Sequence, residues 1–261
     1  MGQDARQSSS QAKIILDAQK ERAGQKQAKL IDQQTRQFDQ ARKQLQEDQS
    51  HLEYVKPQQF IFQHHNSKTG TVLHLNDIGL IHGCISPINL TITGREHIHL
   101  AGINGSGKST LLKTIHGELA PTTGILQKSV NSLYLDQNFS FLNPQLSATE
   151  NLHNINPFYS ETQWRNLLGQ FRLRRDKGII PLGQLSGGEQ LKVALLAISQ
   201  HQKNIGLLLL DEPENHLDIE SRDLLASAIR QFPGAVLLVS HDPAFVTSCA
   251  VHRIIQMNHF S

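Results

Sequence analysis

Hydrophobic positions follow different patterns on the two sides of Pro57. Residues 11–55 are rich in glutamine, lysine and aspartate and contain no proline and a single glycine, Gly24, which favours a long helix. Its apolar positions recur every seven residues, at Ile31, Phe38, Leu45 and Leu52. Because the positions between them are mostly polar, this narrow stripe can lie along one partner helix but cannot form a core. We predict either a solvated spacer helix or a helix paired with a partner.

Strand-like patterns begin near Gln58. Apolar and polar residues alternate in QFIFQHH, TVLHLNDIGL and INLTITGREHIHLAG, with turn signals at Asn-Asp, His-Gly and Thr-Gly. Four further strands are predicted in SLYLDQ, GLLLLD, GAVLLVS and VHRIIQM. Helices are predicted over 108–116, where Gly117 ends the helix, over 219–231, and over most of 147–202. Strands that alternate with helices, and that are almost continuously apolar, indicate a parallel sheet buried on both faces.

The composition limits the class of protein. Of the 261 residues, 25 are basic and 23 acidic, so the formal net charge is +2 and any contact with nucleic acid must be local. Cys84 and Cys249 show no metal-ligand spacing and imply no disulfide framework. No apolar run approaches a bilayer span, and the polar N-terminus lacks the apolar core of a signal peptide. We expect a soluble intracellular protein, and the polar start suggests a piece of a longer one.

A glycine-rich loop follows one of the alternating strands. LAGINGSGKST contains the pattern G-x-x-x-x-G-K-S, between an apolar strand and a predicted helix. Glycines let main-chain N–H groups close around phosphates, and the helix N-terminus adds its dipole. We expect Lys108 to reach the β- and γ-phosphates, Ser109 to ligate Mg²⁺ and Thr110 to contact the α-phosphate. The other phosphate-binding candidates are Gly102, Asn104, Gly105, Ser106 and Gly107.

Two acidic residues and a histidine follow two of the late strands. Asp211 and Glu212 come directly after four leucines, and His241 ends the next apolar run. In open α/β sheets, ligands gather at the carboxyl edge of the strands. We expect Asp211 to hold Mg²⁺, Glu212 to orient or deprotonate the water that attacks the γ-phosphate, and His241 to bind that water or the γ-phosphate. The alternative for either acid alone is a cap of the next helix, which the pair and the glycine loop disfavour.

The order of the motifs resembles an ATP-binding cassette (ABC) ATPase domain. The glycine loop, LDQ, LSGGEQ, LLLLDEP, NHLD and VSHD follow one another between about Pro57 and Met257. The resemblance implies an α/β fold, that of the ABC-type P-loop NTPase domain. Such a domain has a mainly parallel core sheet, an antiparallel β-subdomain and a helical subdomain, here at about 147–202, that contains the signature LSGGEQ. The resemblance also implies that Gln137 touches Mg²⁺ and the attacking water.

The same resemblance assigns residues to a seam between two cassettes. In the family, the signature loop of one cassette caps the γ-phosphate bound to the glycine loop of the other. The signature residues here are Ser186, Gly187 and Gly188. Residues Asn215 to Asp218 belong to the loop that crosses the seam. A partner cassette is therefore implied, either the upstream half of the same protein or a second copy of the chain.

Within the family, ENHLD resembles the soluble F branch (ABC-F), whereas transporter ATPases usually have Ser-Ala-Leu-Asp after the acidic pair. ABC-F proteins contain two cassettes joined by a long helical linker, which in ribosome-bound members reaches toward tRNA. Residues 1–56 resemble part of that linker, and residues 57–261 resemble the second cassette. The resemblance implies a cytoplasmic ATPase that uses ATP and Mg²⁺ and acts as a switch on the ribosome, without a membrane partner. Where the family places an aromatic residue against adenine, this chain has Ile81 or His82.

Two other functions stay open. One is the ATPase subunit of an ABC membrane transporter, which NHLD and the N-terminal helix disfavour. The other is a nucleotide-binding half-site that is inactive without its partner cassette.

Overall fold

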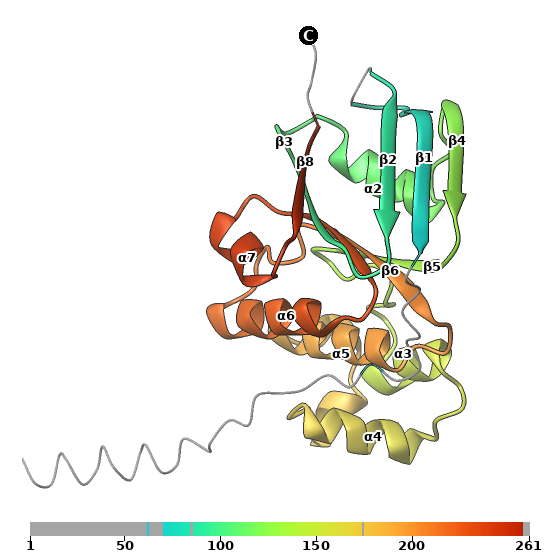
Figure 1. Ribbon diagram of the computed structural model, residues 1–261. Helices are drawn as coiled ribbons and strands as arrows, with labels where there is room; N and C mark the ends of the chain where they lie inside the picture. The colour runs from blue at the N-terminus through green and yellow to red at the C-terminus, as the bar shows by residue number, and fades with distance from the viewer. Residues whose placement is uncertain (1–61, 63–69, 84–85, 174, 258–261) are drawn as a thin grey trace, which may run out of the picture. The chain divides into compact units, whose positions relative to one another are not determined.

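The computed structural model describes residues 62, 70–83, 86–173 and 175–257 (Figure 1). They belong to the second of the two units into which the chain divides, Gln58–Ser261. The predicted linker helix, residues 1–56, lies outside the described residues. Within the described ranges, no helix combines the length and the apolarity that crossing a membrane requires.

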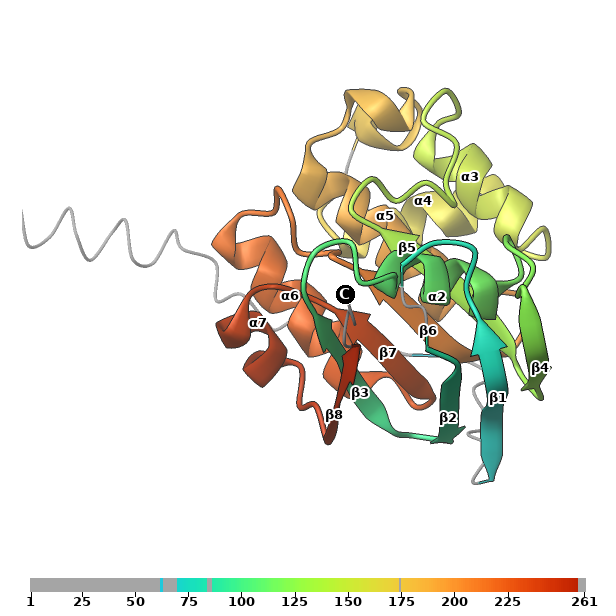
Figure 2. The same ribbon diagram turned by 90° about the horizontal axis from the view of Figure 1, so that it is seen from above.

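Two sheets form the framework of this unit (Figure 2). The smaller sheet is antiparallel with the strand order β2-β1-β4, and the larger is parallel with the order β5-β6-β7-β3-β8. The antiparallel strands are β1 (Thr71–Gly79), β2 (Ile88–Thr93) and β4 (Thr123–Lys128). The parallel strands are β3 (His97–Gly102), β5 (Asn131–Asp136), β6 (Ile205–Asp211), β7 (Ala235–Val239) and β8 (Arg253–Met257). The predicted α/β class, with a parallel core sheet and an antiparallel subdomain, is confirmed.

Strand β6 separates two hydrophobic cores. Leu207 and Leu209 belong to the core that includes the antiparallel sheet, while Leu208 and Leu210 belong to the core on the opposite face. Successive side chains of a strand point to opposite faces, so a strand buried on both faces requires a continuous apolar run. The stretch GLLLLD meets that requirement, and β6 accordingly lies inside the parallel sheet.

Helix α2 (Lys108–His116) occupies the space between the two sheets (Figure 1). Its Leu111, Leu112 and Ile115 are at most 1% exposed and share a core with residues of both sheets. Gly117 ends the helix in a left-handed conformation, with φ of 103°. Both ends of this helix agree with the sequence prediction, and the antiparallel sheet serves to cover the face of α2 that the parallel sheet leaves open.

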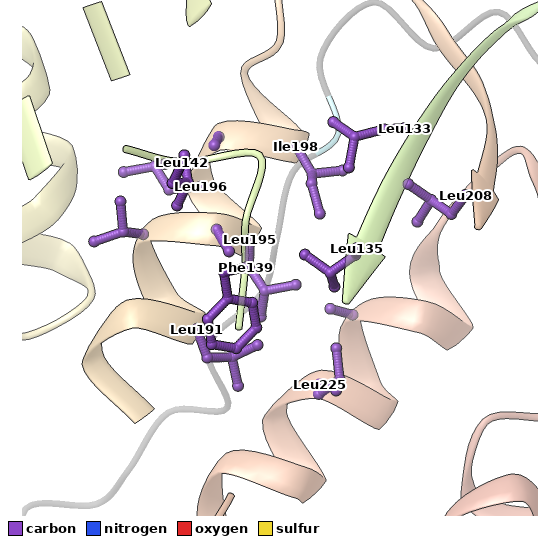
Figure 3. Packing of buried hydrophobic residues seen from close by; sticks show 14 of the residues in the cluster. Leu133, Leu135, Phe139, Leu142, Leu191, Leu195, Leu196, Ile198, Leu208 and Leu225 are labelled. Atoms are coloured by element: carbon purple, nitrogen blue, oxygen red, sulfur yellow. The ribbon is translucent and has the colours of Figure 1, made fainter. Parts of the chain in front are cut away.

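Helices cover the other face of the parallel sheet (Figure 1). They are α5 (Gly187–Ser199), α6 (Ile219–Gln231) and α7 (Pro243–Ser248). Helices α3 (Ala148–Ile155) and α4 (Glu161–Gln170) pack against each other and against α5, in the same region as the 3₁₀ turns η1 (Arg175–Gly178) and η2 (Leu182–Gln184). Figure 3 shows Leu191 and Leu195 of α5 gathered with Phe139 beside the sheet residue Leu135. The bounds of α6 agree with the prediction, and helices fill the predicted helical region. The sequence predicts neither β4 nor α7.

Candidate nucleotide-binding site

The predicted site residues other than the signature gather at the carboxyl edge of the parallel sheet. Asp136 pairs in register with Asp211, and Asp211 pairs with Val239, so β5, β6 and β7 end side by side. Strand β3, which leads into the glycine loop, lies next to β7. Gln137 and Glu212 each follow one of these strand ends directly. Segments far apart in the sequence therefore meet at a single edge.

The glycine loop places bare backbone at the start of α2. Gly105 (φ 80°) and Gly107 (φ 95°) adopt left-handed conformations, which glycine reaches at little cost. Helix α2 begins with no side-chain cap and no acidic residue in its first turn, so its N–H groups are free to bind an anion. The Oγ atom of Ser106 is buried and has no hydrogen-bond partner within the described residues. A cradle of backbone N–H groups with one unpaired hydroxyl fits a phosphate chain.

Lys108 lies beside the loop and is only 6% exposed. Its Nζ donates hydrogen bonds to the carbonyl oxygens of Gly102 at 2.8 Å and Ile103 at 3.0 Å. An ammonium group has three donors, so one donor remains for a phosphate oxygen. The backbone of the glycine loop thus holds the Lys108 ammonium group next to the predicted phosphate site.

Two hydroxyl groups bind the carboxylate of Asp211. Ser109 Oγ donates to Oδ1 at 3.1 Å, and Tyr134 Oη donates to Oδ2 at 2.7 Å. Burial raises the pKa of Tyr134, and its hydrogen bond to the Asp211 carboxylate raises that pKa further. The phenol therefore stays protonated and remains a donor. Ser109 and Asp211 offer the hard oxygen ligands that Mg²⁺ prefers, so the residues present fit this ion.

A second group of side chains is connected through Glu212. Its Oε1 lies 3.3 Å from His241 Nε2, and its Oε2 accepts a hydrogen bond from Asn215 Nδ2 at 2.8 Å. Asn215 Nδ2 also lies 3.4 Å from Gln137 Oε1. Three predicted catalytic residues are thus joined in one chain of contacts, with Asn215 as the bridge. Glu212 itself has φ of 50°, a strained conformation of the kind that clusters at functional sites.

The signature residues occupy the N-terminus of α5. Ser186 caps the helix, and its side chain accepts from Glu189 N while the Glu189 carboxylate accepts from Ser186 N at 3.0 Å. Lys177 forms an ion pair with Glu189. A Cβ atom on Gly188 would lie 2.4 Å from Ser221 Oγ in the first turn of α6, so the signature packs tightly against that helix.

No hydrogen bond of Ser186 or Glu189 joins the signature to the glycine loop within the described part of the chain. The hydrogen bonds of Ser186 and Glu189 stay within the first turn of α5 and with Lys177, and none of them reaches residues 102–110. The signature instead lies next to the loop from Asn215 to Asp218. Asp218 is the last residue of this loop and caps α6.

The turn after β1 lies against the glycine loop. A Cβ on Gly83 would be 2.3 Å from Gly107 Cα, so the two backbones are in close contact. Ile81, one of the two candidates for the adenine position, is 53% exposed. His82, the other candidate, is also exposed. His82 directly precedes Gly83, and Ile81 directly precedes His82.

Sequence reasoning missed Tyr134 as a partner of Asp211. One signal was present, because a tyrosine in an otherwise apolar strand needs a hydrogen-bond partner for its hydroxyl when it is buried. Glu214 was also missed. It is 2% exposed and accepts a hydrogen bond from Ser240 Oγ, and nothing in the sequence shows that these two residues meet.

A parallel sheet that brings a glycine loop, the helix after it and an acidic pair to one edge defines a P-loop nucleoside triphosphatase domain. The family described as "ABC transporter" matches residues 85–215, which are half of the chain. The chain belongs to this ATP-binding cassette family.

Curated relatives include members of the F branch. The chain is 35% identical over 192 residues to YheS of Escherichia coli (strain K12), with 71% of this chain and 30% of YheS covered. It is 34% identical over 168 residues to human ATP-binding cassette sub-family F member 3, with 63% of this chain and 23% of that protein covered. ABC transporter F family member 4 of Arabidopsis thaliana is 35% identical over 170 residues, with 62% and 23% covered. These matches confirm the resemblance to ABC-F cassettes, and the chain spans less than a third of each relative.

A solved structure shares the fold. An ABC transporter of the metal-chelate type, in an inward-facing conformation, superposes with a TM-score of 0.58 and 22% identity. The match covers 73% of this chain and 81% of that chain. At this identity, the likeness concerns the fold alone.

Proposed function

We propose that this cassette binds ATP with Mg²⁺ and hydrolyses it to ADP and phosphate at a site that a second cassette completes. The observation that supports this most directly is the connected group Gln137, Asn215, Glu212 and His241 beside the Ser109–Asp211 pair. Separate strands and loops supply these side chains. A purely structural ion-pair network does not require a bare glycine loop next to it.

The proposal gives each residue a role that its contacts support. The N–H groups at the start of α2 and the free donor of Lys108 hold the phosphates. Ser109, Asp211 and Gln137 would hold Mg²⁺, which supplies positive charge against the β- and γ-phosphates when bound. Glu212 orients the attacking water and takes its proton, because its carboxylate is held by contacts on both oxygens. Most of the rate enhancement then comes from positioning and charge.

The signature is proposed to serve the partner's nucleotide. The N–H groups of Gly187 and Gly188 stand at the start of a 13-residue helix, where the dipole favours an anion. Since the contacts of Ser186 do not extend to this chain's own glycine loop, the phosphate that they meet belongs to a second cassette. That cassette is the upstream half of a longer protein or a second copy.

On the level of the whole protein, we propose a cytoplasmic conformational switch on the ribosome, of the ABC-F type. The supporting observations are the NHLD motif and the F-branch relatives. Residues 1–56 are proposed to be part of the linker that approaches tRNA. Co-sedimentation of the ATP-bound protein with ribosomes tests this role. Co-purification with a polytopic membrane protein instead would assign the cassette to a transporter, as the family description allows.

The catalytic proposal is tested with Glu212→Gln. The amide keeps the hydrogen-bonding shape but cannot accept the proton, so we expect ATP binding to remain and turnover to fall at least tenfold, about 1.4 kcal/mol in barrier. Binding is measured by calorimetry and turnover by phosphate release. Unchanged turnover would remove Glu212 from its role. ATP binding without turnover in the unmodified chain would favour the half-site that needs its partner.

A further inference from the structure

A buried carboxyl group links the two segments that hold Glu212 and His241. Glu214 is two residues after Glu212, and its Oε1 accepts a hydrogen bond from Ser240 Oγ. Ser240 directly precedes His241. Glu214 is 2% exposed and Ser240 is 5% exposed, so water does not compete for this bond. The Glu214–Ser240 bond therefore connects the loop after β6 to the turn after β7. Glu214 is two residues from Glu212, and Ser240 is one residue from His241, so the bond lies close to the Glu212–His241 contact along both segments.

Ser240 is held by further partners. Its Oγ accepts a hydrogen bond from Asp242 N at 3.1 Å, and its carbonyl oxygen is 3.1 Å from His99 Nε2 of β3. Asp242 caps α7 and forms an ion pair with Arg222 of α6 at 3.3 Å. Ser240 is therefore held in place by its contacts with β3 and with the residue that caps α7. Glu214 provides the connection from this anchored residue to the loop of Glu212.

The bond is made at a cost to stability. The second carboxyl oxygen of Glu214, Oε2, is buried and has no hydrogen-bond partner within the described residues. A buried unpaired polar atom destabilises a fold, and each such atom in a native structure calls for an explanation. Burial raises the pKa of Glu214, and the nearby charges of Glu212 and Asp242 add to this effect, while the bond from Ser240 opposes it. A costly group beside a reaction centre points to a functional role.

We propose that Glu214 is a positioning residue for the Glu212–His241 pair. Its hydrogen bond to Ser240 holds the loop after β6 and the turn after β7 at the separation at which His241 Nε2 lies 3.3 Å from Glu212 Oε1. Glu214 does not touch nucleotide. It acts through the placement of two residues whose catalytic role rests on the function proposed above.

The test compares variants of the full 261-residue chain. Glu214→Ala and Ser240→Ala each remove one side of the bond, and we expect each to lower kcat roughly tenfold while the dissociation constant of Mg-ATP changes less than about twofold. The loss in the double variant should be smaller than the two single losses combined, because both substitutions remove the Glu214–Ser240 bond. Ser240→Ala also removes the acceptor for Asp242 N. Glu214→Gln keeps an acceptor oxygen and should restore most of the loss. Ser199→Ala is the matched control, since it removes a buried serine hydroxyl that bonds Leu196 O in α5.

A second readout does not depend on hydrolysis. The ring ¹⁵N signals of His241 are identified among the 14 histidines by their absence in His241→Gln. They should shift in Glu214→Ala and in Ser240→Ala, and stay in place in Ser199→Ala. The proposal would be overturned if the losses of kcat were additive in the double variant. It would also be overturned if the His241 signals did not shift in either single variant. A wild-type chain that binds no ATP would contradict the proposed function, and the NMR comparison would still decide whether Glu214 positions His241.

Discussion

At the scale of single residues, Asp211 is the carboxylate that we propose binds Mg²⁺, and its two oxygens are already held in place. Ser109 and Tyr134 bind its two oxygens from two different elements, α2 and β5. A carboxylate held on both sides loses less rotamer freedom when it meets a ligand. Tyr134 is buried and its ring packs near His116, with 6.1 Å between the ring centroids, so its hydroxyl is itself well positioned.

Tyr134→Phe should therefore weaken the Mg²⁺-dependent part of ATP binding. The ring keeps its packing, but the charged Asp211 carboxylate loses the hydrogen bond that Tyr134 donates. We expect the dissociation constant of Mg-ATP to rise roughly five- to tenfold. ATP titrations in the presence of Mg²⁺ and in the presence of EDTA separate the Mg²⁺-dependent part of binding from the Mg²⁺-independent part. Tyr159→Phe is the control, because it removes a hydroxyl that bonds Gln200 Oε1 in the helical region. Equal weakening with and without Mg²⁺ would contradict a role through Asp211.

Glu214 predicts a pH dependence of stability. Burial raises its pKa above the ordinary value near 4.5, so the folded chain holds the proton more tightly than the unfolded chain. The stabilising effect of that proton is complete below about 4.5 and is lost as pH rises through the folded-state pKa. Urea unfolding from pH 5 to pH 8 should show Glu214→Gln gaining stability relative to the wild type as pH rises. Parallel curves for the two proteins would show that Glu214 is not perturbed.

Residues that could be predicted are those whose role depends on local position. Lys108, Asp211 and Glu212 follow from a loop before a helix and from the end of an apolar strand. The contacts of Tyr134 and Glu214 could not be predicted, because Tyr134 meets a partner 77 residues away and Glu214 a partner 26 residues away. Those meetings depend on strand order and register, which periodicity does not specify.

At the scale of elements, length and burial decide what the sequence predicts. α2 and α6 were placed with correct ends because glycine or apolar spacing marks them. β4 is a mostly exposed edge strand with few apolar side chains, and α7 has only six residues, too few for a helical period. Both omissions lie where the pattern contains little information, and neither changes the position of the site.

Gly83→Ala tests the contact between the β1 turn and the glycine loop. The new Cβ would lie 2.3 Å from Gly107 Cα, and φ at this position is 98°. Backbone atoms cannot move aside as a side chain can, and overpacking costs about 1–3 kcal/mol, so we expect ATP affinity to fall roughly tenfold.

Gly117→Ala is the matched control, with φ of 103° and no atom within 4 Å of the added Cβ. It should lower stability by about 1–2 kcal/mol without changing ATP affinity. Equal affinity losses in both variants would contradict a specific effect on the loop.

At the scale of the whole molecule, the order of motifs predicts the family, while the structure shows which elements the signature contacts. The signature packs against α6, and the hydrogen bonds of Ser186 and Glu189 do not reach residues 102–110 within the described part of the chain. We propose that a single cassette supplies two half-sites, with the glycine loop serving one nucleotide and the signature serving another. Motif order alone does not show this, because adjacency in the fold is not adjacency in the chain.

Ser186→Asp tests whether the signature faces a nucleotide on another cassette. Aspartate and asparagine cap helices as well as serine does, so both variants preserve the start of α5. Only aspartate adds a negative charge, which repels a γ-phosphate. In a Glu212→Gln background, which we expect to bind ATP without turnover, ATP should shift the chain to a dimer on a sizing column. Ser186→Asp should abolish that shift, and Ser186→Asn should largely preserve it.

Mixing two inactive variants extends the same prediction to turnover. Lys108→Ala destroys the glycine-loop half of each site, and Ser186→Asp destroys the signature half. A mixed dimer brings the intact glycine loop of one chain to the intact signature of the other, so one of its two sites is whole. Phosphate release should therefore be near background for each variant alone and should reappear on mixing. A monomeric chain that hydrolyses ATP briskly, or a Ser186→Asp chain as active as the wild type, would mean that each cassette contains a complete reaction centre of its own.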